Sequence, residues 1–281
     1  MQQIWKCNSD DTRAMPSQLW KKDLSILLNP EKMTEALLTW RMIENRKEII
    51  LPLVQNLEGA ALGADIIKRE NYWTTGNYPF HNLKEILEKI NTDQFNIIKD
   101  KRIQAVIEVV KRLKENPLIL EVEAPFSVLA SLINPMELYA AMVTEPKLLE
   151  KILKKIVLEE TKYIKEVIQA GCRIISLAEP AGTIDMVGEK YFKECSGKAI
   201  EFLLKECEKF LQKSVIHLCG KLSSSMIAVQ MVKEKEYPVK SKDYLDNILE
   251  VTGNSEIHFV GQRCIHQRKN NTGKIYLLNL N

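Results

Sequence analysis

Glycine and proline are scarce in this sequence, with 11 and 10 residues among 281. This scarcity excludes collagen-like, linker-rich and extensively disordered chains. The sequence also lacks an apolar run of about 18 residues, the length that a membrane-spanning helix needs. Its first residues, Met1–Lys6, are polar and aromatic and do not resemble a secretory leader. We therefore expect a cytoplasmic protein with no membrane partner.

Charge of one sign is not in excess either. Lys and Arg together number 40 against 37 Asp and Glu, which gives a formal net charge of +3. This balance gives no support to a nucleic-acid partner. The 6 cysteines are spread along the chain without the close spacing of a disulfide scaffold. In a reducing compartment, a cysteine that lies near a histidine is more often a metal ligand or a catalytic group than half of a disulfide.

Helical periodicity, by contrast, is abundant. Apolar residues recur at helical spacing in several long stretches, and Pro146 divides one of these into two consecutive helices. The stretches are Pro30–Asn45, Lys101–Asn116, Met136–Ala170, Glu189–Gln212, Leu222–Lys235 and Lys242–Thr252.

Short apolar and β-branched runs lie between these helices. They are Ile49–Val54, Leu118–Val122, Arg173–Leu177, Ser214–Leu218, Glu256–Val260 and Lys274–Leu278. Most are continuously apolar, which is typical of parallel strands buried on both faces. Strands that alternate with helices predict βαβ units, a parallel sheet and a single α/β domain over residues 1–281. In this prediction residues 1–48 form a helical N-terminal extension and residues 49–281 hold the sheet.

Metal-capable residues follow two of the predicted strands. His217 and Cys219 are two residues apart at a strand end, so alternation places both side chains on one face. Cys264 ends the next predicted strand, and His266 is a further candidate as a spare or indirect ligand. Two thiolates and an imidazole suit zinc, and three protein ligands leave an open position as catalytic zinc sites do. The alternative is that these residues are ordinary core side chains.

Several segments, in an order preserved along the chain, are similar to the uroporphyrinogen decarboxylase superfamily. Glu58–Asp65 resembles that family's E-A-L-G-A run, and Ala124–Ala130 resembles its G-P-F-T-L-A segment. Ala170–Pro180 is similar to A-G-A-D-V-I-x-I-x-D-P. Val215–Gly220 resembles the H-I-C-G zinc motif of the family's methylcobamide:coenzyme M methyltransferases, and Gly261–Cys264 resembles the segment that supplies their second cysteine.

This resemblance implies a distorted (β/α)8 barrel of the TIM type in the cobamide-dependent methyltransferase branch. It implies zinc and a corrinoid as cofactors, the corrinoid being carried by a partner protein, and it implies that zinc activates a thiol. The Pro-x-W-x-M-R-Q-A-G-R segment of true decarboxylases is absent, which argues against porphyrinogen decarboxylation. Because 44 residues separate Cys219 from Cys264, we expect the barrel to lack one β/α unit near the C-terminus.

Other residues near the strand ends are weaker site candidates. Three glutamates are candidates for the fourth zinc ligand or for proton handling, the alternative being that they cap strand ends or pair with Arg263: Glu58, Glu123 and Glu179. Tyr72, Trp73 and Arg263 are candidates for binding the substrate. The alternative for the two aromatic residues is a packed loop.

Three functions remain open on the sequence. The resemblance favours a methyltransferase that exchanges a methyl group between a corrinoid and a zinc-activated thiol. A second hypothesis is an enzyme that demethylates a small-molecule donor, such as an aryl methyl ether, onto a cob(I)alamin protein. A third is a non-catalytic protein that binds a corrinoid protein. Abundant Lys, Ile and Asn indicate an AT-rich bacterial genome, and corrinoid chemistry would then favour an anaerobic cytoplasm.

Overall fold

A seven-stranded sheet lies at the centre of the computed structural model, which describes residues 15–69 and 72–281. The strands are β1 (Ile49–Leu51), β4 (Leu118–Glu123), β5 (Ile174–Ala178), β6 (Val215–Leu218), β7 (Val232–Pro238), β8 (Phe259–Gly261) and β9 (Lys274–Leu280). They pair in the order β1-β4-β5-β6-β8-β9-β7. The first five in this order are parallel, whereas β9 pairs antiparallel with both β8 and β7.

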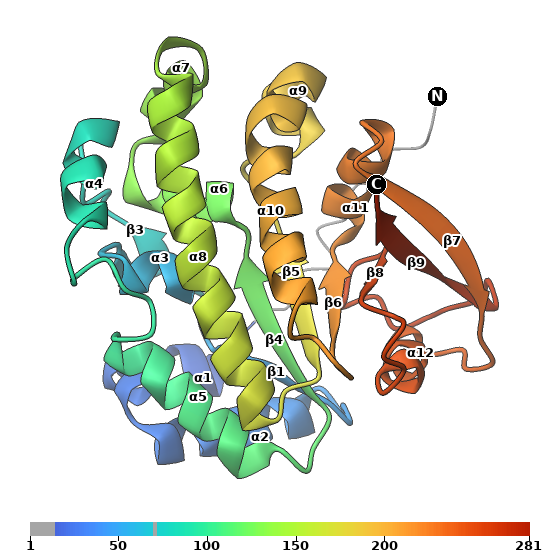
Figure 1. Cartoon of the computed structure of the whole chain (residues 1–281). Coiled ribbons are helices and arrows are strands. Elements are labelled where there is room, and N and C mark those ends of the chain that lie inside the picture. The colour runs from blue at the N-terminus through green and yellow to red at the C-terminus, as the bar shows by residue number, and fades with distance from the viewer. Residues whose placement is uncertain (1–14, 70–71) are drawn as a thin grey trace.

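Helices connect and cover these strands. They are α1 (Ser17–Trp20), α2 (Pro30–Ile43), α3 (Leu57–Ala61), α4 (Leu83–Ile90), α5 (Lys101–Leu113), α6 (Pro125–Leu132), α7 (Pro135–Thr144), α8 (Pro146–Ala170), α9 (Ile184–Tyr191), α10 (Gly197–Glu208), α11 (Gly220–Ala228) and α12 (Tyr244–Val251). A 3-10 helix spans Leu24–Leu28, a π-helical turn spans Phe192–Ser196, and β2 (Asp65–Lys68) pairs with β3 (Trp73–Gly76). In Figure 1, α8 and α10 run side by side across the sheet, with β7 and β9 at its far edge.

Each face of the sheet packs in a separate hydrophobic cluster. Leu120 and Val122 of β4 belong to a large cluster with the helices α2, α5, α8 and α10. Ile119 points to the other face, where it joins Tyr244 and Ile248 of α12. Alternation along the strands therefore makes the central strands apolar on both faces over most of their length, as the continuous apolar runs predicted.

The helices predicted over Pro30–Asn45, Lys101–Asn116 and Met136–Ala170 are present, although α2 ends at Ile43 and α5 at Leu113. The region from residue 136 to 170 is divided into α7 and α8, and Pro146 occupies the first turn of α8, where the missing backbone N–H costs nothing. The side chain of Asn29 accepts a hydrogen bond from the backbone of Lys32 at 3.0 Å and caps α2. Asp100 caps α5 through the backbone of Arg102 and Ile103. These signals depend only on residues that are close together in the chain, so they can be read from the sequence without knowledge of the tertiary structure.

The predicted helix over Leu222–Lys235 is wrong in its second half. Helix α11 ends at Ala228, and the chain then forms β7, whose residues are mostly exposed. The segment Lys233–Glu236 alternates charges that are compatible with a helix, but its backbone pairs along its whole length with β9. Tertiary pairing overrides local propensity here. The predicted strand at Lys274–Leu278 exists as β9, although it is antiparallel to its neighbours.

The parallel run of the sheet skips one strand near the C-terminus. β6 pairs directly with β8, with Ile216 opposite Phe259 and His217 opposite Val260. The strand between them in sequence, β7, lies at the outer edge beside β9. The structure thus confirms an α/β fold with a mostly parallel sheet, and the backbone pairing of the described strands leaves β1 and β7 as its two edges. Within the described ranges, none of the helices is both long and apolar enough to cross a membrane.

Candidate active site at the carboxyl edge of the sheet

A polar layer crosses one face of the sheet near the carboxyl ends of the strands. Register pairs Glu121 of β4 with Ser176 of β5, and Ser176 with His217 of β6. Residues opposite one another on neighbouring strands point to the same face, so these three side chains form one row. The row beneath it, Ile50–Ile119–Ile174–Val215, is entirely apolar and packs against α12. In β4, β5 and β6 the side chains on this face thus change from apolar to polar over two residues.

His217 is fully buried within this layer, and both of its ring nitrogens have partners. Nε2 lies 3.1 Å from the carbonyl oxygen of Arg263, and Nδ1 lies 3.1 Å from Oγ of Ser176. Burial lowers the pKa of His217 to about 4, so the ring is neutral at pH 7. Since a carbonyl oxygen can only accept, Nε2 carries the hydrogen and Nδ1 accepts from the Ser176 hydroxyl.

The two cysteines of the predicted metal site lie on adjoining segments. Cys219 directly follows β6 and precedes α11, and its backbone N–H donates to the carbonyl of Leu177 at 3.0 Å. Cys264 lies in the turn after β8. Ser223 ties the two segments together, because its hydroxyl donates to the Cys219 carbonyl at 2.9 Å and accepts from the backbone N–H of Gln262 at 2.8 Å.

The donor chemistry of His217, Cys219 and Cys264 suits zinc, and the pairing of β6 with β8 brings their segments to one edge. As placed, however, no three acidic, histidine or cysteine side chains of residues 15–69 and 72–281 are gathered closely enough to hold an ion. A metal at His217 would have to replace one of the two hydrogen bonds of its ring. The residue types are therefore those that zinc prefers.

His266, a further ligand candidate from the sequence, is a second histidine at this edge. Nε2 of His266 lies 2.8 Å from Oε1 of Glu121, the carboxylate in the same row as His217. The side chain of His266 is 10% exposed, and its Nδ1 is buried with no hydrogen-bond partner among the described residues. Sequence reasoning missed Glu121, although its spacing of two from Glu123 places both side chains on one face of β4.

The three candidate glutamates have different surroundings. Glu179 accepts hydrogen bonds from the backbone N–H groups of Phe126 at 3.1 Å and Ser127 at 3.3 Å, which lie in the first turn of α6. It also accepts from the Ser127 hydroxyl and from the backbone of Gly182. Burial raises the pKa of Glu179 to about 8, while these hydrogen bonds oppose the rise. Its contacts are those of a structural cap that joins β5 to α6.

Glu58 lacks such hydrogen bonds. Both carboxyl oxygens of Glu58 are buried without a hydrogen-bond partner in the described structure, and burial raises its pKa to about 8. Burial and the nearby Glu121 raise the pKa of Glu123 to about 7. Glu123 lines a hollow of about 360 Å³ above the strand ends, together with polar side chains such as Asn56 and Ser127.

The three residues predicted to bind substrate are not among those that line this hollow: Tyr72, Trp73 and Arg263. Trp73 is 4% exposed at the start of β3 with Lys68 over its ring at 5.6 Å, and Tyr72 is 54% exposed. The aromatic residues that line the hollow are Tyr78 and Tyr139. Arg263 lies over the ring of Tyr244 at 5.7 Å and donates to the carbonyl of Lys269 at 2.9 Å.

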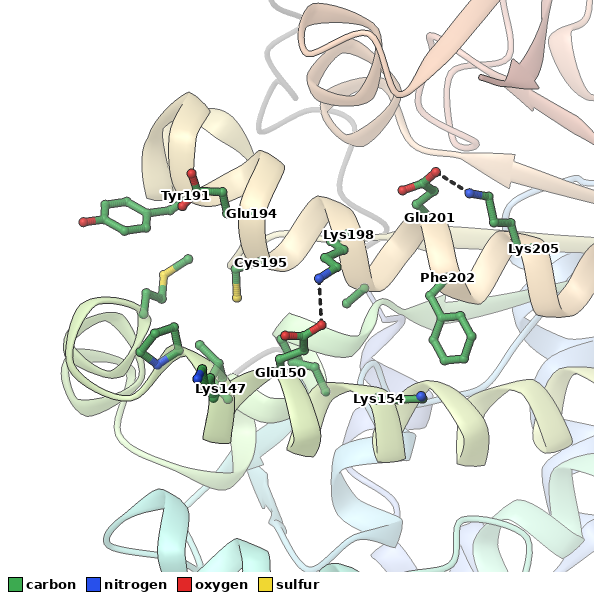
Figure 2. A pocket seen from close by; sticks show the side chains of 15 residues that line it. Lys147, Glu150, Lys154, Tyr191, Glu194, Cys195, Lys198, Glu201, Phe202 and Lys205 are labelled. Carbon is green, nitrogen blue, oxygen red and sulfur yellow. Dashed lines mark hydrogen bonds and ion pairs between the residues drawn. The ribbon is translucent and has the colours of Figure 1, made fainter.

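Another hollow, of about 370 Å³, opens on the outer surface between α8 and the segment of α9 and α10. Figure 2 shows that Cys195 points into it and that the ion pair of Lys198 with Glu150, at 2.7 Å, bridges the two helices. Burial raises the pKa of Cys195 to about 12, so this thiol is not a ready nucleophile. The hollow lies among helices rather than at the strand ends, where parallel α/β proteins assemble their active sites.

Sequence comparison assigns the chain to a family. The profile described as "Uroporphyrinogen decarboxylase (URO-D)" matches residues 24–263. The chain belongs to the uroporphyrinogen decarboxylase family. The match spans the sheet from β1 to β8 and includes His217, Cys219 and the turn before Cys264, so the predicted resemblance is confirmed.

Within the uroporphyrinogen decarboxylase family, the chain is similar to methyltransferases. It is 25% identical over 209 residues to the methylcobamide:CoM methyltransferase MtaA of Methanosarcina barkeri (strain Fusaro / DSM 804), and 24% identical to a second MtaA of Methanosarcina barkeri. Each alignment covers 70% of this chain and 58% of the relative, so the chain spans less than two thirds of their length. A methyltransferase structure from Methanosarcina mazei shares the fold, with a TM-score of 0.58 at 19% identity over 73% of this chain and 60% of the other.

Proposed function

We propose that this protein is a cytoplasmic, zinc-dependent methyltransferase that exchanges a methyl group between a corrinoid protein and a small thiol. One observation carries the proposal. In a chain similar to methylcobamide:CoM methyltransferases, the pairing of β6 with β8 brings the segments of His217, Cys219 and Cys264 to one edge of the sheet. We assign these three residues as the zinc ligands.

The chemistry follows from the donor set. A free thiol is mostly protonated at neutral pH, and zinc, when bound, would lower the pKa of a coordinated thiol and supply a thiolate. In the transfer, the thiolate sulfur would form a bond to the methyl carbon of the methylated corrinoid, and the carbon–cobalt bond would break with its electron pair left on cobalt. The products are the methyl thioether, cob(I)alamin and a proton, and in our proposal Glu123 takes up the proton from within the hollow, since its pKa of about 7 suits exchange at neutral pH.

The protein's own residues position these groups. The Arg263 carbonyl fixes the tautomer of His217, so that Nδ1 is the nitrogen with a lone pair to offer. Ser223 holds the Cys219 segment against the turn that carries Cys264. The apolar row beneath the site excludes water from below, which leaves the carboxyl edge as the approach for the corrinoid protein.

A second candidate is demethylation of an aromatic methyl donor onto a corrinoid protein. It is favoured by Tyr78, Tyr139 and Met186, which line the hollow beside Glu123 and offer apolar surface to a ring. In this reaction the same edge of the sheet would bind the donor, and the methyl group would move toward cobalt.

Metal analysis and a methyl-transfer assay test the proposal. Protein purified without oxygen should contain one zinc per chain, and with methylcob(III)alamin and a panel of small thiols it should produce cob(I)alamin, followed by absorbance. Cys219→Ser and Cys264→Ser should lose zinc and activity, while Cys195→Ser, outside the edge, should keep both. Stoichiometric zinc with no reaction toward any thiol, but methylation of cob(I)alamin by an aryl methyl ether, would favour the second candidate. Absence of zinc and of both reactions would leave only a binding role.

A further inference from the structure

The hollow beside Glu123 has an acidic lining. Among the described residues that line it, Glu123 alone has a carboxyl side chain, and none of them is a lysine, an arginine or a histidine. Its pKa of about 7 leaves the Glu123 carboxyl mostly ionised above that pH. The charge that a ligand meets in this hollow is therefore negative.

The hydroxyl groups of α6 and α7 that line the hollow use their hydrogens within the protein. The Tyr139 hydroxyl donates to the carbonyl of Ala181 at 3.1 Å, and the Ser131 hydroxyl donates to the carbonyl of Val128 at 2.7 Å. The Ser127 hydroxyl donates to Glu179. A hydroxyl that has given its hydrogen in this way retains lone pairs, so it can serve a ligand as an acceptor.

Two helix starts near the hollow are also occupied. The N-terminal turn of a helix attracts anions through its unpaired N–H groups. In α6 the N–H groups of Phe126 and Ser127 donate to Glu179 at 3.1 and 3.3 Å. In α3 the N–H of Gly59 donates to the side chain of Asn56 at 2.9 Å. An anionic ligand would therefore find these N–H groups already paired.

Two further carboxyl groups lie buried close to Glu123. Glu58 of α3 and Glu160 of α8 are 1% and 0% exposed, and none of their carboxyl oxygens has a hydrogen-bond partner among the described residues. Burial raises the pKa of both, and the nearby Glu123 raises it further. Buried acidic groups that lack a partner are costly. A positive charge in the hollow would favour the ionised forms of these groups and is the charge that they lack.

Aromatic side chains complete the lining. Tyr78 and Tyr139 both line the hollow, and the ring of Tyr139 stacks on Phe126 with 6.2 Å between the ring centroids. The faces of aromatic rings attract organic cations. The volume of about 360 Å³ is near the lower end of the range of about 300 to 1,000 Å³ that is typical of small-molecule sites. Carboxylate, acceptor oxygens and aromatic rings together suit a small ammonium compound.

We propose that this hollow binds a small organic cation, so that the thiol of the proposed methyl transfer is an aminothiol whose ammonium group pairs with Glu123. The inference rests on the proposed function for the role of the cation as a substrate, whereas the preference for positive charge depends on the hollow alone. An ammonium group beside Glu123 favours its ionised form, which is the form that accepts the thiol proton. An anionic thiol would bring a second negative charge to a hollow whose described lining has no basic side chain.

Binding of sulfur-free probes tests the charge preference apart from zinc and methyl transfer. We would titrate ethylammonium and ethanesulfonate with the full-length protein at pH 8.0, in the presence of a chelator, and follow the ligands by NMR. The two probes share a two-carbon chain and differ in the charge of the head group. At this pH an alkylammonium is still protonated, as the lysine side chain is, and Glu123 is ionised.

Three variants locate the preference. Glu123→Gln removes the negative charge and nearly preserves the shape of the side chain. Met186→Lys adds a positive charge at a position that lines the hollow and is 51% exposed. Met136→Lys is the matched control, because Met136 is 72% exposed and is not among the residues that line the hollow. Thermal unfolding shows whether each variant is folded, and Met186→Lys decides if Glu123→Gln is not.

We expect the wild type to bind ethylammonium at least about 10-fold more tightly than ethanesulfonate. Glu123→Gln should weaken ethylammonium binding by about 10-fold or more, the effect of losing a hydrogen bond between charged groups. Met186→Lys should weaken ethylammonium binding and strengthen ethanesulfonate binding, and Met136→Lys should match the wild type. In the methyl-transfer assay, KM should be lowest for 2-aminoethanethiol, intermediate for 2-mercaptoethanol and highest for 2-mercaptoethanesulfonate.

The outcomes separate this inference from the proposed function. If the wild type binds neither probe, or binds ethanesulfonate as tightly as ethylammonium, the preference for a cation is refuted, even when methyl transfer to an uncharged or anionic thiol is observed. If ethylammonium binds selectively and Glu123→Gln and Met186→Lys weaken it while Met136→Lys does not, the hollow is a cation site. In that case the absence of methyl transfer to any thiol, 2-aminoethanethiol included, would refute the proposed function and the role of the cation as its acceptor, and would leave the binding preference standing.

Discussion

Nε2 of His217 lies 3.1 Å from the carbonyl oxygen of Arg263, although 46 residues separate the two in sequence. This contact joins the end of β6 to the turn after β8. It forms because β8 occupies the place next to β6, while the strand between them in sequence lies at the outer edge of the sheet. The position of Cys264 relative to His217 therefore depends on how closely β8, β9 and α11 pack.

Gly261 at the end of β8 makes that packing possible. A Cβ added there would meet Cδ1 of Leu278 at 2.6 Å and Cβ of Ser223 at 2.9 Å. We expect Gly261→Ala to destabilise the protein by about 1 to 3 kcal/mol through overpacking, and to weaken zinc binding by displacing the turn. Urea unfolding followed by circular dichroism measures the first effect and chelator competition the second. Gly253→Ala, where a Cβ meets nothing within 4 Å, serves as a control for the added methyl group, although its positive φ adds local strain. Equal zinc affinity in Gly261→Ala and the wild type would contradict the link to the site.

We expect the main role of Glu179 to be stabilisation of the fold. Replacing it with alanine leaves the backbone donors of Phe126, Ser127 and Gly182 without their acceptor in a buried place. We expect Glu179→Ala to lower the free energy of unfolding by about 3 kcal/mol, within the range for several buried donors left unpaired. Glu179→Gln keeps one acceptor oxygen and should cost less. Denaturant unfolding of both variants checks this order, and an alanine variant as stable as the wild type would show that the cap contributes nothing.

Glu58 should make stability depend on pH. Burial raises its pKa from 4.5 to about 8, so between these values the folded protein holds a proton that the unfolded chain releases. Stability is then fully present below pH 4.5 and is lost as the pH rises toward 8, by up to about 1.4 kcal/mol per pH unit for one group. Glu58→Gln should remove this component and make the profile less steep, with Glu123 and Glu179 still contributing, whereas the exposed Glu88→Gln should leave the slope unchanged. Thermal unfolding from pH 5 to 8 measures the slopes, and parallel profiles for Glu58→Gln and the wild type would refute the assignment.

Zinc should protect two particular thiols from alkylation. Cys219 and Cys264 are partly exposed, whereas Cys172 and Cys207 are fully buried and burial raises the pKa of both. With zinc removed by a chelator, iodoacetamide at pH 7.5 should label Cys219 and Cys264, and added zinc should suppress this labelling. Peptide mass spectrometry identifies the labelled positions, with Cys172 as the internal control that stays unmodified. Identical labelling of Cys219 and Cys264 with and without zinc would argue against both as ligands.

The sequence by itself determined the central elements of this fold. Helical periodicity and Pro146 predict α2, α5, α7 and α8, because these signals are local and depend on backbone chemistry. Continuous apolar runs predict the central strands, and polar residues after them indicate the site edge. His217, Cys219 and Cys264 could be proposed as ligands for that reason, together with the family resemblance.

Tertiary structure decided what depends on contacts between distant segments. The segment Lys233–Glu236 is a strand because β9 lies beside it, and no property of its alternating charges requires that. Glu121 and His266 meet because the turn after β8 folds back over the row of polar residues on β4, β5 and β6. Local sequence patterns predict the backbone conformation of a segment and which of its side chains are buried. Which carboxylate anchors which imidazole is fixed only when the strands take their order in the sheet.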